Sequence, residues 1–166
     1  MTVQATSSAL APAALAPRII ALIIDGLVLG ICGILIVGIF VNDVSIVGSV
    51  IRGILFAALG FLYYGYTWTA WRATPGQRLM GLLTVNAADG AALTWNQAMM
   101  RWAYLFGPSV VSNLFSAQTG SGLGAIVGLV VLGYYIYLLY TTAQDPRRQG
   151  FHDKQAGSLV VVKTAA

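Results

Sequence analysis

Long apolar runs constrain this chain more strongly than any other feature of its sequence. Three of them, at residues 19–41, 47–71 and 123–142, each contain at most one charged residue. A helix rises about 1.5 Å per residue, so about 20 residues cross a hydrocarbon core of roughly 30 Å. Of the 166 residues, 58% are hydrophobic and 8% are charged, and a soluble domain of this length cannot bury so much apolar side chain. The sequence therefore predicts a single-domain integral membrane protein.

A fourth segment, at residues 102–117, is also apolar, but it is shorter and contains Pro108. On its own it is compatible with a kinked span, a re-entrant segment or a helix on the membrane surface. Arg18 precedes the first run, three arginines lie between the second run and residue 102, and four basic residues follow the last run, whereas the two remaining connections carry none. The positive-inside rule places every basic segment in the cytoplasm, and this is possible only with four spans and both termini in the cytoplasm.

We therefore expect an all-α protein of the plasma or inner membrane. Residues 1–17 are expected to form a mobile cytoplasmic tail, and residues 18–163 a single membrane domain. The spans are expected at about 19–41, 47–71, 102–117 and 123–142, with Thr94 capping the helix that begins at Trp95.

Two segments outside the spans, at about 82–94 and 159–163, have the character of short cytoplasmic strands. In the first, Leu82–Asn86 and residues 91–94 flank an Asp89-Gly90 turn, which is typical of a β-hairpin. An alternative follows from an internal similarity, because Arg78, Gly81, Leu83 and Val85 recur 76 residues later as Lys154, Gly157, Leu159 and Val161. Two parallel repeats of two spans each would bring 82–86 and 159–163 together beneath the membrane. Aromatic belts and basic loops also recur in unrelated membrane proteins, so both interpretations stand.

Asp25 is the only acidic residue inside an apolar run. It follows Arg18 by seven residues, or two helical turns, so both side chains project from one helix face. An ionised side chain in the bilayer costs about 2.5–3.5 kcal/mol on insertion scales, so Asp25 should face the bundle and have a partner. Arg101 and the tyrosines of the 63–66 segment are the candidates. Asp25 then either handles an ion or proton or holds the helices together.

The composition argues against several classes of chemistry. With one cysteine, one histidine and no glutamate, we expect no metal site, no cofactor and no enzyme activity. The net charge is +4, but the basic residues stand at the ends of apolar runs, which does not favour nucleic-acid binding. Arg147 and Arg148 are expected to meet anionic lipid headgroups. His152 and Asp153 are expected to tie the C-terminal tail to the Thr74–Arg78 loop.

Together, these motifs resemble the RDD family of small membrane proteins, named for one arginine and two aspartates. The resemblance covers about residues 16–163, with Gln77 where a lysine is common and Ser158 where a threonine is common. It is carried by Pro17-Arg18 and Ile24-Asp25, by Thr74, Pro75, Gly76, Arg78 and Gly81, by Arg101, and by His152, Asp153 and Gly157. It implies that Arg18 and Asp25 are the family's arginine and first aspartate, and that Asp153 is the second.

The resemblance also implies transport of an unidentified ligand, with cation/proton exchange as one form. We expect transport of an ion or small solute around Asp25, with Arg18, Asp25 and Arg101 as the polar core. Four spans offer few polar groups for a pathway, so a homo-oligomer or larger membrane complex is expected. The alternative function is a non-catalytic accessory or scaffold subunit of a larger membrane complex.

Overall fold

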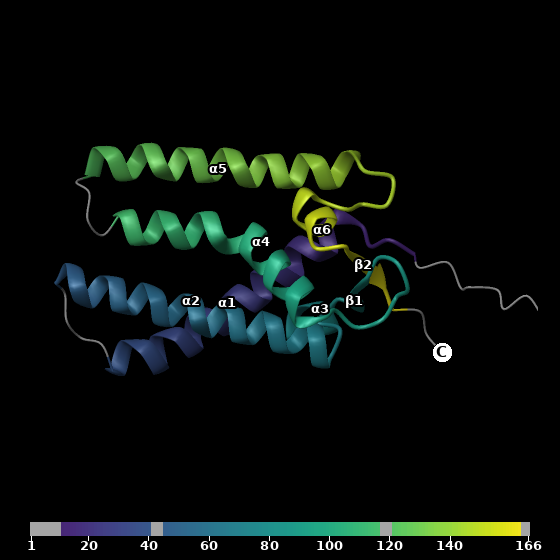
Figure 1. Ribbon diagram of the computed structural model, residues 1–166, viewed down its shortest axis with the longest axis horizontal. Helices are drawn as coiled ribbons and strands as arrows, with labels where there is room; N and C mark the ends of the chain where they lie inside the picture. Colours follow the sequence, from purple (N-terminus) through teal and green to yellow (C-terminus); the bar gives the residue numbers. More distant parts are fainter. Residues whose placement is uncertain (1–10, 41–44, 117–120, 164–166) are drawn as a thin grey trace, which may run out of the picture.

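Four long helices form the body of the protein, whose computed structural model describes residues 11–40, 45–116 and 121–163. They are α1 (Leu15–Phe40), α2 (Ile46–Ala70), α4 (Trp95–Ser116) and α5 (Ser121–Gln144). In Figure 1, α1 ends and α2 begins at the same end of the molecule at which α4 ends and α5 begins. The short elements α3 (Pro75–Leu79), α6 (Phe151–Gln155), β1 (Leu82–Asn86) and β2 (Ser158–Val162) lie together at the opposite end, hereafter the sheet end.

Three of these helices are long and apolar enough to cross a membrane. Their candidate spans are Leu15–Leu35, Ile46–Ala70 and Gly122–Gln144. Large apolar side chains remain exposed along them, such as Leu27, Ile54 and Leu129. Water would penalise this exposure, whereas lipid covers it without cost. The protein is thus a membrane protein with several candidate spans, mostly helical, with a small antiparallel sheet at one end.

The fourth long helix, α4, begins seven residues before the segment that its apolar residues predicted. Thr94 provides the expected cap, since its hydroxyl accepts from the Gln97 N–H at 3.2 Å and the Gln97 side chain accepts from the Thr94 N–H at 3.1 Å. This reciprocal pair satisfies two N–H groups at the helix start. The polar first turn and Arg101 therefore belong to the same helix as the apolar remainder, which includes Pro108.

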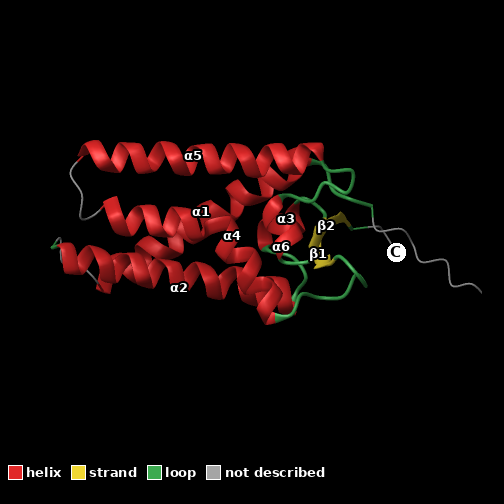
Figure 2. Cartoon of the chain, turned by 45° about the horizontal axis from the view of Figure 1, so that its top comes forward, coloured by secondary structure: helices red, strands yellow, loops and turns green. Residues whose placement is uncertain are grey.

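The two strands pair with each other rather than forming the predicted hairpin. β1 and β2 are antiparallel, with Thr84 opposite Val160. Residues 91–94 are not a strand, so that part of the hairpin prediction was wrong. The first residue of that segment accepts a single backbone hydrogen bond from the Asn86 N–H at 2.9 Å, and the Arg72 guanidinium donates to the preceding Gly90 carbonyl at 2.6 Å. The alternative pairing of 82–86 with the C-terminal strand is confirmed, because β1 pairs along its whole length with β2, whose residues are mostly buried and apolar (Figure 2).

Residues 76 positions apart have matching conformations on the two sides of the sheet. Arg72 and Arg148 have φ angles of 59° and 54°, and Gly81 and Gly157 have 65° and 60°. The central strand pair, Thr84 and Val160, has the same separation. A two-fold axis through that pair would exchange β1 with β2, which is the relation that a duplicated two-span unit predicts.

Residues before Arg18 already contact the sheet. The Ala13 N–H donates to the Val160 carbonyl at 2.9 Å, and the Val162 N–H donates to the Ala11 carbonyl at 3.0 Å. Residues 11–13 thus run along β2, and Leu15 already belongs to α1. The expected mobile tail therefore does not extend to residue 17, and its residues 1–10 lie outside the described part of the chain.

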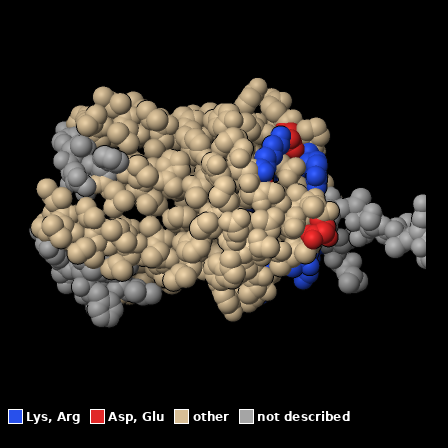
Figure 3. All heavy atoms as spheres, in the orientation of Figure 1, with Lys and Arg blue, Asp and Glu red and all other residues tan. Residues whose placement is uncertain are grey.

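Charged side chains gather at the sheet end on the face drawn in Figure 3, while the long helices present uncharged surface there. This separation of charged and apolar surface is what a bilayer requires, because charged groups stay in water and apolar groups enter lipid.

Candidate polar site at the sheet end of the bundle

Asp153 of α6 is fully buried between two arginines. Its carboxylate accepts from Arg18 Nη1 at 3.2 Å and pairs closely with Arg101 Nη1. The Gly150 N–H and the Ser158 hydroxyl each donate to it at 3.1 Å. A buried charge is tolerated only when it is paired and hydrogen-bonded. Asp153 therefore joins α1, α4, α6 and β2 at one point.

Asp25 is also buried, but it forms no ion pair with a described residue. Its carboxylate accepts from the Tyr63 hydroxyl at 2.8 Å, the Thr74 hydroxyl at 2.5 Å and the Gly76 N–H at 2.8 Å. Thr74 is itself the N-cap of α3, and Pro75 opens that helix. Asp25 therefore holds the start of α3 against α1 and α2.

Gly76 allows this close approach. A Cβ added there would stand 2.9 Å from Asp25 Cγ and nearer still to the Ala21 carbonyl oxygen. No larger residue fits between α3 and the backbone of α1 without displacing one of them. The Thr-Pro-Gly segment thus combines a cap, a helix start and a contact surface.

The Arg18–Arg101–Asp153 cluster carries an excess of positive charge. His152 Nε2 lies 3.5 Å from Asp153 Oδ2, so a protonated His152 would be a third cation in this cluster. However, burial and then the charges of Arg101 and Arg18 hold the pKa of His152 well below its usual value. His152 is therefore neutral at neutral pH, and two guanidinium groups share one carboxylate.

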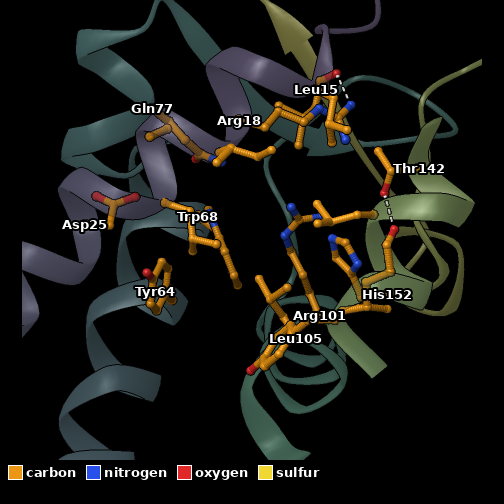
Figure 4. Close-up of a pocket in the computed structure, with 17 residues that line it drawn as sticks. Leu15, Arg18, Asp25, Tyr64, Trp68, Gln77, Arg101, Leu105, Thr142 and His152 are labelled. Carbon is orange, nitrogen blue, oxygen red and sulfur yellow. Dashed lines mark hydrogen bonds between the residues drawn. The ribbon is translucent and has the colours of Figure 1, made fainter. Parts of the chain in front are cut away.

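Asp25 and the two arginines that pair with Asp153 border one pocket of about 300 Å³, shown in Figure 4. Arg18, Asp25, Arg101 and His152 contribute polar side chains to its wall, and Trp68 contributes an aromatic ring. The guanidinium carbon of Arg101 lies 4.9 Å from the centre of that ring, at cation–π distance. The rest of the wall is mainly aliphatic.

A second, larger pocket of about 620 Å³ lies farther along the bundle. It is lined by residues of α1, α2 and α4, and Arg52, Ser109 and Asn113 add polar groups to its wall. Leu22 and Tyr64 border both pockets. The two spaces are therefore separated by only a thin wall of side chains.

The structure brings together the three residues predicted as the polar core, since Arg18, Asp25 and Arg101 line one pocket. Their partners differ from the expectation. Tyr63 does bond to Asp25, but Arg101 pairs with Asp153. The spacing of residues along a helix predicts which side chains share a face of that helix. It does not predict which residue of another element contacts that face.

One further expectation about the cytoplasmic motif needs correction. The Asp153 carboxylate bonds to Arg18 and Arg101 rather than to the Thr74–Arg78 loop. Arg78 lies outside the pocket, with its guanidinium 4.7 Å from the centre of the exposed Trp71 ring. Gly81 and Gly157 have backbone roles, since each adopts a positive φ just before a strand.

Sequence reasoning missed Gly150, Ser158 and Trp68 as parts of the site. Gly150 could have been found from the internal similarity, because it lies 76 positions after Thr74 and is likewise the N-cap of a short helix. Trp68 resembled one more member of an aromatic belt, and no pattern in the sequence marked it as buried.

The comparisons with known proteins agree with the motifs. The model of the RDD family matches residues 12–157, which is nearly the whole chain. No curated protein and no solved structure matches it. The matched range contains α1 to α6 and the site residues from Arg18 to Asp153, and it ends one residue before Ser158.

Proposed function

Because the chain belongs to the RDD family of membrane proteins, we propose that it transports an ion or small solute across the cell membrane. The binding chamber is the pocket bordered by Arg18, Asp25 and Arg101. The proposal is supported by the burial of Asp25 and Arg101 in a bundle whose helices expose large apolar side chains. Ionisable groups inside membrane proteins are costly and are kept mainly at ion and substrate pathways.

The proposed topology has four spans with both termini in the cytoplasm. α4 serves as the fourth span, because its 22 residues cover roughly 33 Å at about 1.5 Å per residue. It runs alongside the other long helices in Figure 1. The sheet end, which holds Arg147, Arg148 and Lys154, then faces the cytoplasm, as the positive-inside rule requires.

The observation that carries the transport proposal is the pair of neighbouring pockets. They share Leu22 and Tyr64 as a common wall. Polar groups lie at both extremes, with Arg18 and Arg101 near the sheet end and Arg52 and Asn113 farther along. A movement of Leu22 or Tyr64 would join the pockets into one path, which is a small change of the kind that gates transport.

Cation/proton exchange would have to use Asp25, since Asp153 is held by two arginines. The Tyr63 hydroxyl, the Thr74 hydroxyl and the Gly76 N–H all donate to the Asp25 carboxylate and occupy its oxygens. A cation would therefore bind only if the start of α3 moved away from α1. In this form of the proposal, α3 is the element that couples ion binding to a change of conformation.

A flux measurement with purified protein in liposomes tests the proposal. Internal pH is followed with a dye after jumps of Na⁺ or K⁺, and a second arm follows chloride and phosphate uptake. We expect flux in the wild type, loss of flux in Asp25→Asn, and unchanged flux in Asp89→Asn, whose side chain is exposed in the loop after β1. Folded wild-type protein without flux for any of these ions would count against transport.

A second candidate function is an accessory or scaffold subunit of a larger membrane complex. One observation favours it: Asp25 and Asp153 each bind donors of this chain from several elements, as a purely structural core would. The exposed apolar faces of α2 and α5 would then contact partner helices or a second copy of the chain. Recovery of a stoichiometric partner with the full-length protein, together with no flux from the protein alone, would favour this candidate.

A further inference from the structure

Four buried nitrogen atoms around the sheet-end pocket have no hydrogen-bond partner among the described residues. They are Arg18 Nε, Trp68 Nε1, Arg101 Nε and His152 Nδ1. All four residues border the same pocket, and Figure 4 shows them around a common space. Trp68 and Arg101 are at least nine-tenths buried. Unpartnered buried polar groups are uncommon in native proteins, and each calls for a specific explanation.

These atoms share a chemical character. The arginine and tryptophan nitrogens can only donate, and the histidine nitrogen can donate or accept depending on its tautomer. Within the described residues, every buried side-chain oxygen already has a hydrogen-bond partner, so none is left to accept from these donors. An acceptor with several oxygens would satisfy the donors. Asp25 also borders the pocket, but its carboxylate is held by Tyr63, Thr74 and Gly76. On the side of the pocket where Arg18 and Arg101 share Asp153, the two guanidinium groups therefore favour an anion.

The pocket is otherwise apolar and opens sideways. Ile19 and Leu22 on α1 and Leu139 on α5 border it, yet 36%, 39% and 43% of their surfaces are exposed. Its mouth therefore lies between α1 and α5, on the surface that lipid covers. Arg18 is the fourth residue of α1, about 5 Å from the helix start at about 1.5 Å per residue. This places the donors at the depth of lipid headgroups.

We propose that the pocket binds one anionic phospholipid, with its phosphate among Arg18, Trp68 and Arg101 and an acyl chain leaving between α1 and α5. The inference goes beyond the proposed function, because it gives the same pocket a lipid ligand whose binding does not require flux. A free inorganic anion would satisfy the donors equally but would leave the aliphatic wall and the lateral opening without a role. Arg147 and Arg148 would attract anionic lipids to the surface without selecting one.

Native mass spectrometry of the detergent-purified full-length chain tests this inference without any flux. The probes are dioleoyl phosphatidylglycerol and dioleoyl phosphatidylcholine, which have the same chains but different headgroup charge, and excess inorganic phosphate as a competitor. We expect one phosphatidylglycerol to bind at least about tenfold more tightly than phosphatidylcholine, and phosphate not to displace it. Trp68→Phe and Arg101→Lys should each weaken binding about tenfold, since each removes a donor to a charged group.

Trp95→Phe and Arg147→Gln are the matched controls, because Trp95 and Arg147 are exposed and do not border the pocket. They should bind phosphatidylglycerol as the wild type does. Equal binding of the two lipids, displacement by phosphate, or unchanged binding by Trp68→Phe would each overturn the inference. If Trp68→Phe and Arg101→Lys lose lipid binding as predicted while the wild type shows no flux, the lipid site stands and the transport proposal fails.

Discussion

At the scale of single residues, the two buried aspartates have different environments. Asp153 neutralises one of two buried guanidinium groups, whereas Asp25 accepts three hydrogen bonds from neutral donors. Loss of a charge should therefore have different consequences at the two sites. At Asp153 it leaves two buried cations unpaired, and at Asp25 it leaves neutral groups that an amide can still partly satisfy.

Asp153→Asn should lower the free energy of unfolding by about 3–5 kcal/mol, because it leaves Arg18 and Arg101 buried without a counter-charge. Asp145→Asn is the matched control, since Asp145 pairs with the exposed Lys154 and such surface pairs contribute under about 1 kcal/mol. Thermal or denaturant unfolding in a neutral detergent measures both. Equal effects of the two substitutions would show that Asp153 is not the electrostatic centre of the fold.

Gly76→Ala should destabilise the protein by about 1–3 kcal/mol, as overpacking usually does, because its Cβ would enter the contact between α3 and α1. Gly128→Ala should not, since nothing lies within 4 Å of a Cβ added there. The same unfolding measurement compares them. A fully stable Gly76→Ala protein would contradict the close approach of α3 to Ala21 and Asp25.

Stability should fall below about pH 6.5, the ordinary pKa of histidine, because the pKa of His152 is lowered by burial and by Arg101 and Arg18. Below that pH, His152 binds a proton in the unfolded chain but not in the folded chain. Its contribution to the free energy of unfolding is therefore complete above the histidine pKa of the unfolded chain and declines as the pH falls. His152→Gln should show a weaker decline between pH 7 and pH 5. An identical pH dependence of the two proteins would refute the assignment.

At the scale of elements, the sheet and the short helices position the polar site. α3 and α6 each begin at a capping residue and end at a glycine of positive φ, and each leads into a strand. The pairing of β1 with β2 then fixes α3 and α6 relative to each other. The polar site therefore depends on a contact between segments that are 76 residues apart.

The long elements could be predicted from the sequence because the hydropathy of a span is a local property. The partner of β1 could not be chosen by local rules, since Asp89-Gly90 is a sound hairpin turn and yet the returning strand comes from residue 158 onward. The same reason explains why Arg101 stood as a candidate partner of Asp25 beside the tyrosines of the 63–66 segment. Contacts between distant segments depend on tertiary packing, and only the internal similarity gave a sequence signal for them.

A disulfide test addresses the register of the sheet. In a Cys32→Ser background, the pair Thr84→Cys and Val160→Cys should cross-link under mild oxidation, because these residues are opposite each other. The pair Thr84→Cys and Val161→Cys should not, since neighbouring residues of a strand point to opposite faces. Gel mobility with and without reductant distinguishes the two. Cross-linking of the second pair alone would mean a register shifted by one residue.

At the scale of the whole molecule, charged side chains gather at the sheet end on the face drawn in Figure 3, and the bundle holds two neighbouring pockets. The transport proposal requires that the wall between the pockets meets water and solute during the cycle. Leu22 belongs to that wall, whereas Leu27, one helical turn and a fraction farther along α1, is 63% exposed on the outer surface.

The most direct test is therefore side-chain accessibility during flux, in the Cys32→Ser background in liposomes. A membrane-impermeant, charged thiol reagent is added to Leu22→Cys and, as the matched control, to Leu27→Cys. The proposal predicts that the reagent modifies Leu22→Cys and abolishes its flux, and that Leu27→Cys stays unmodified and active. Flux that continues in fully modified Leu22→Cys, or a residue 22 that never reacts while flux proceeds, would contradict a pathway through these pockets.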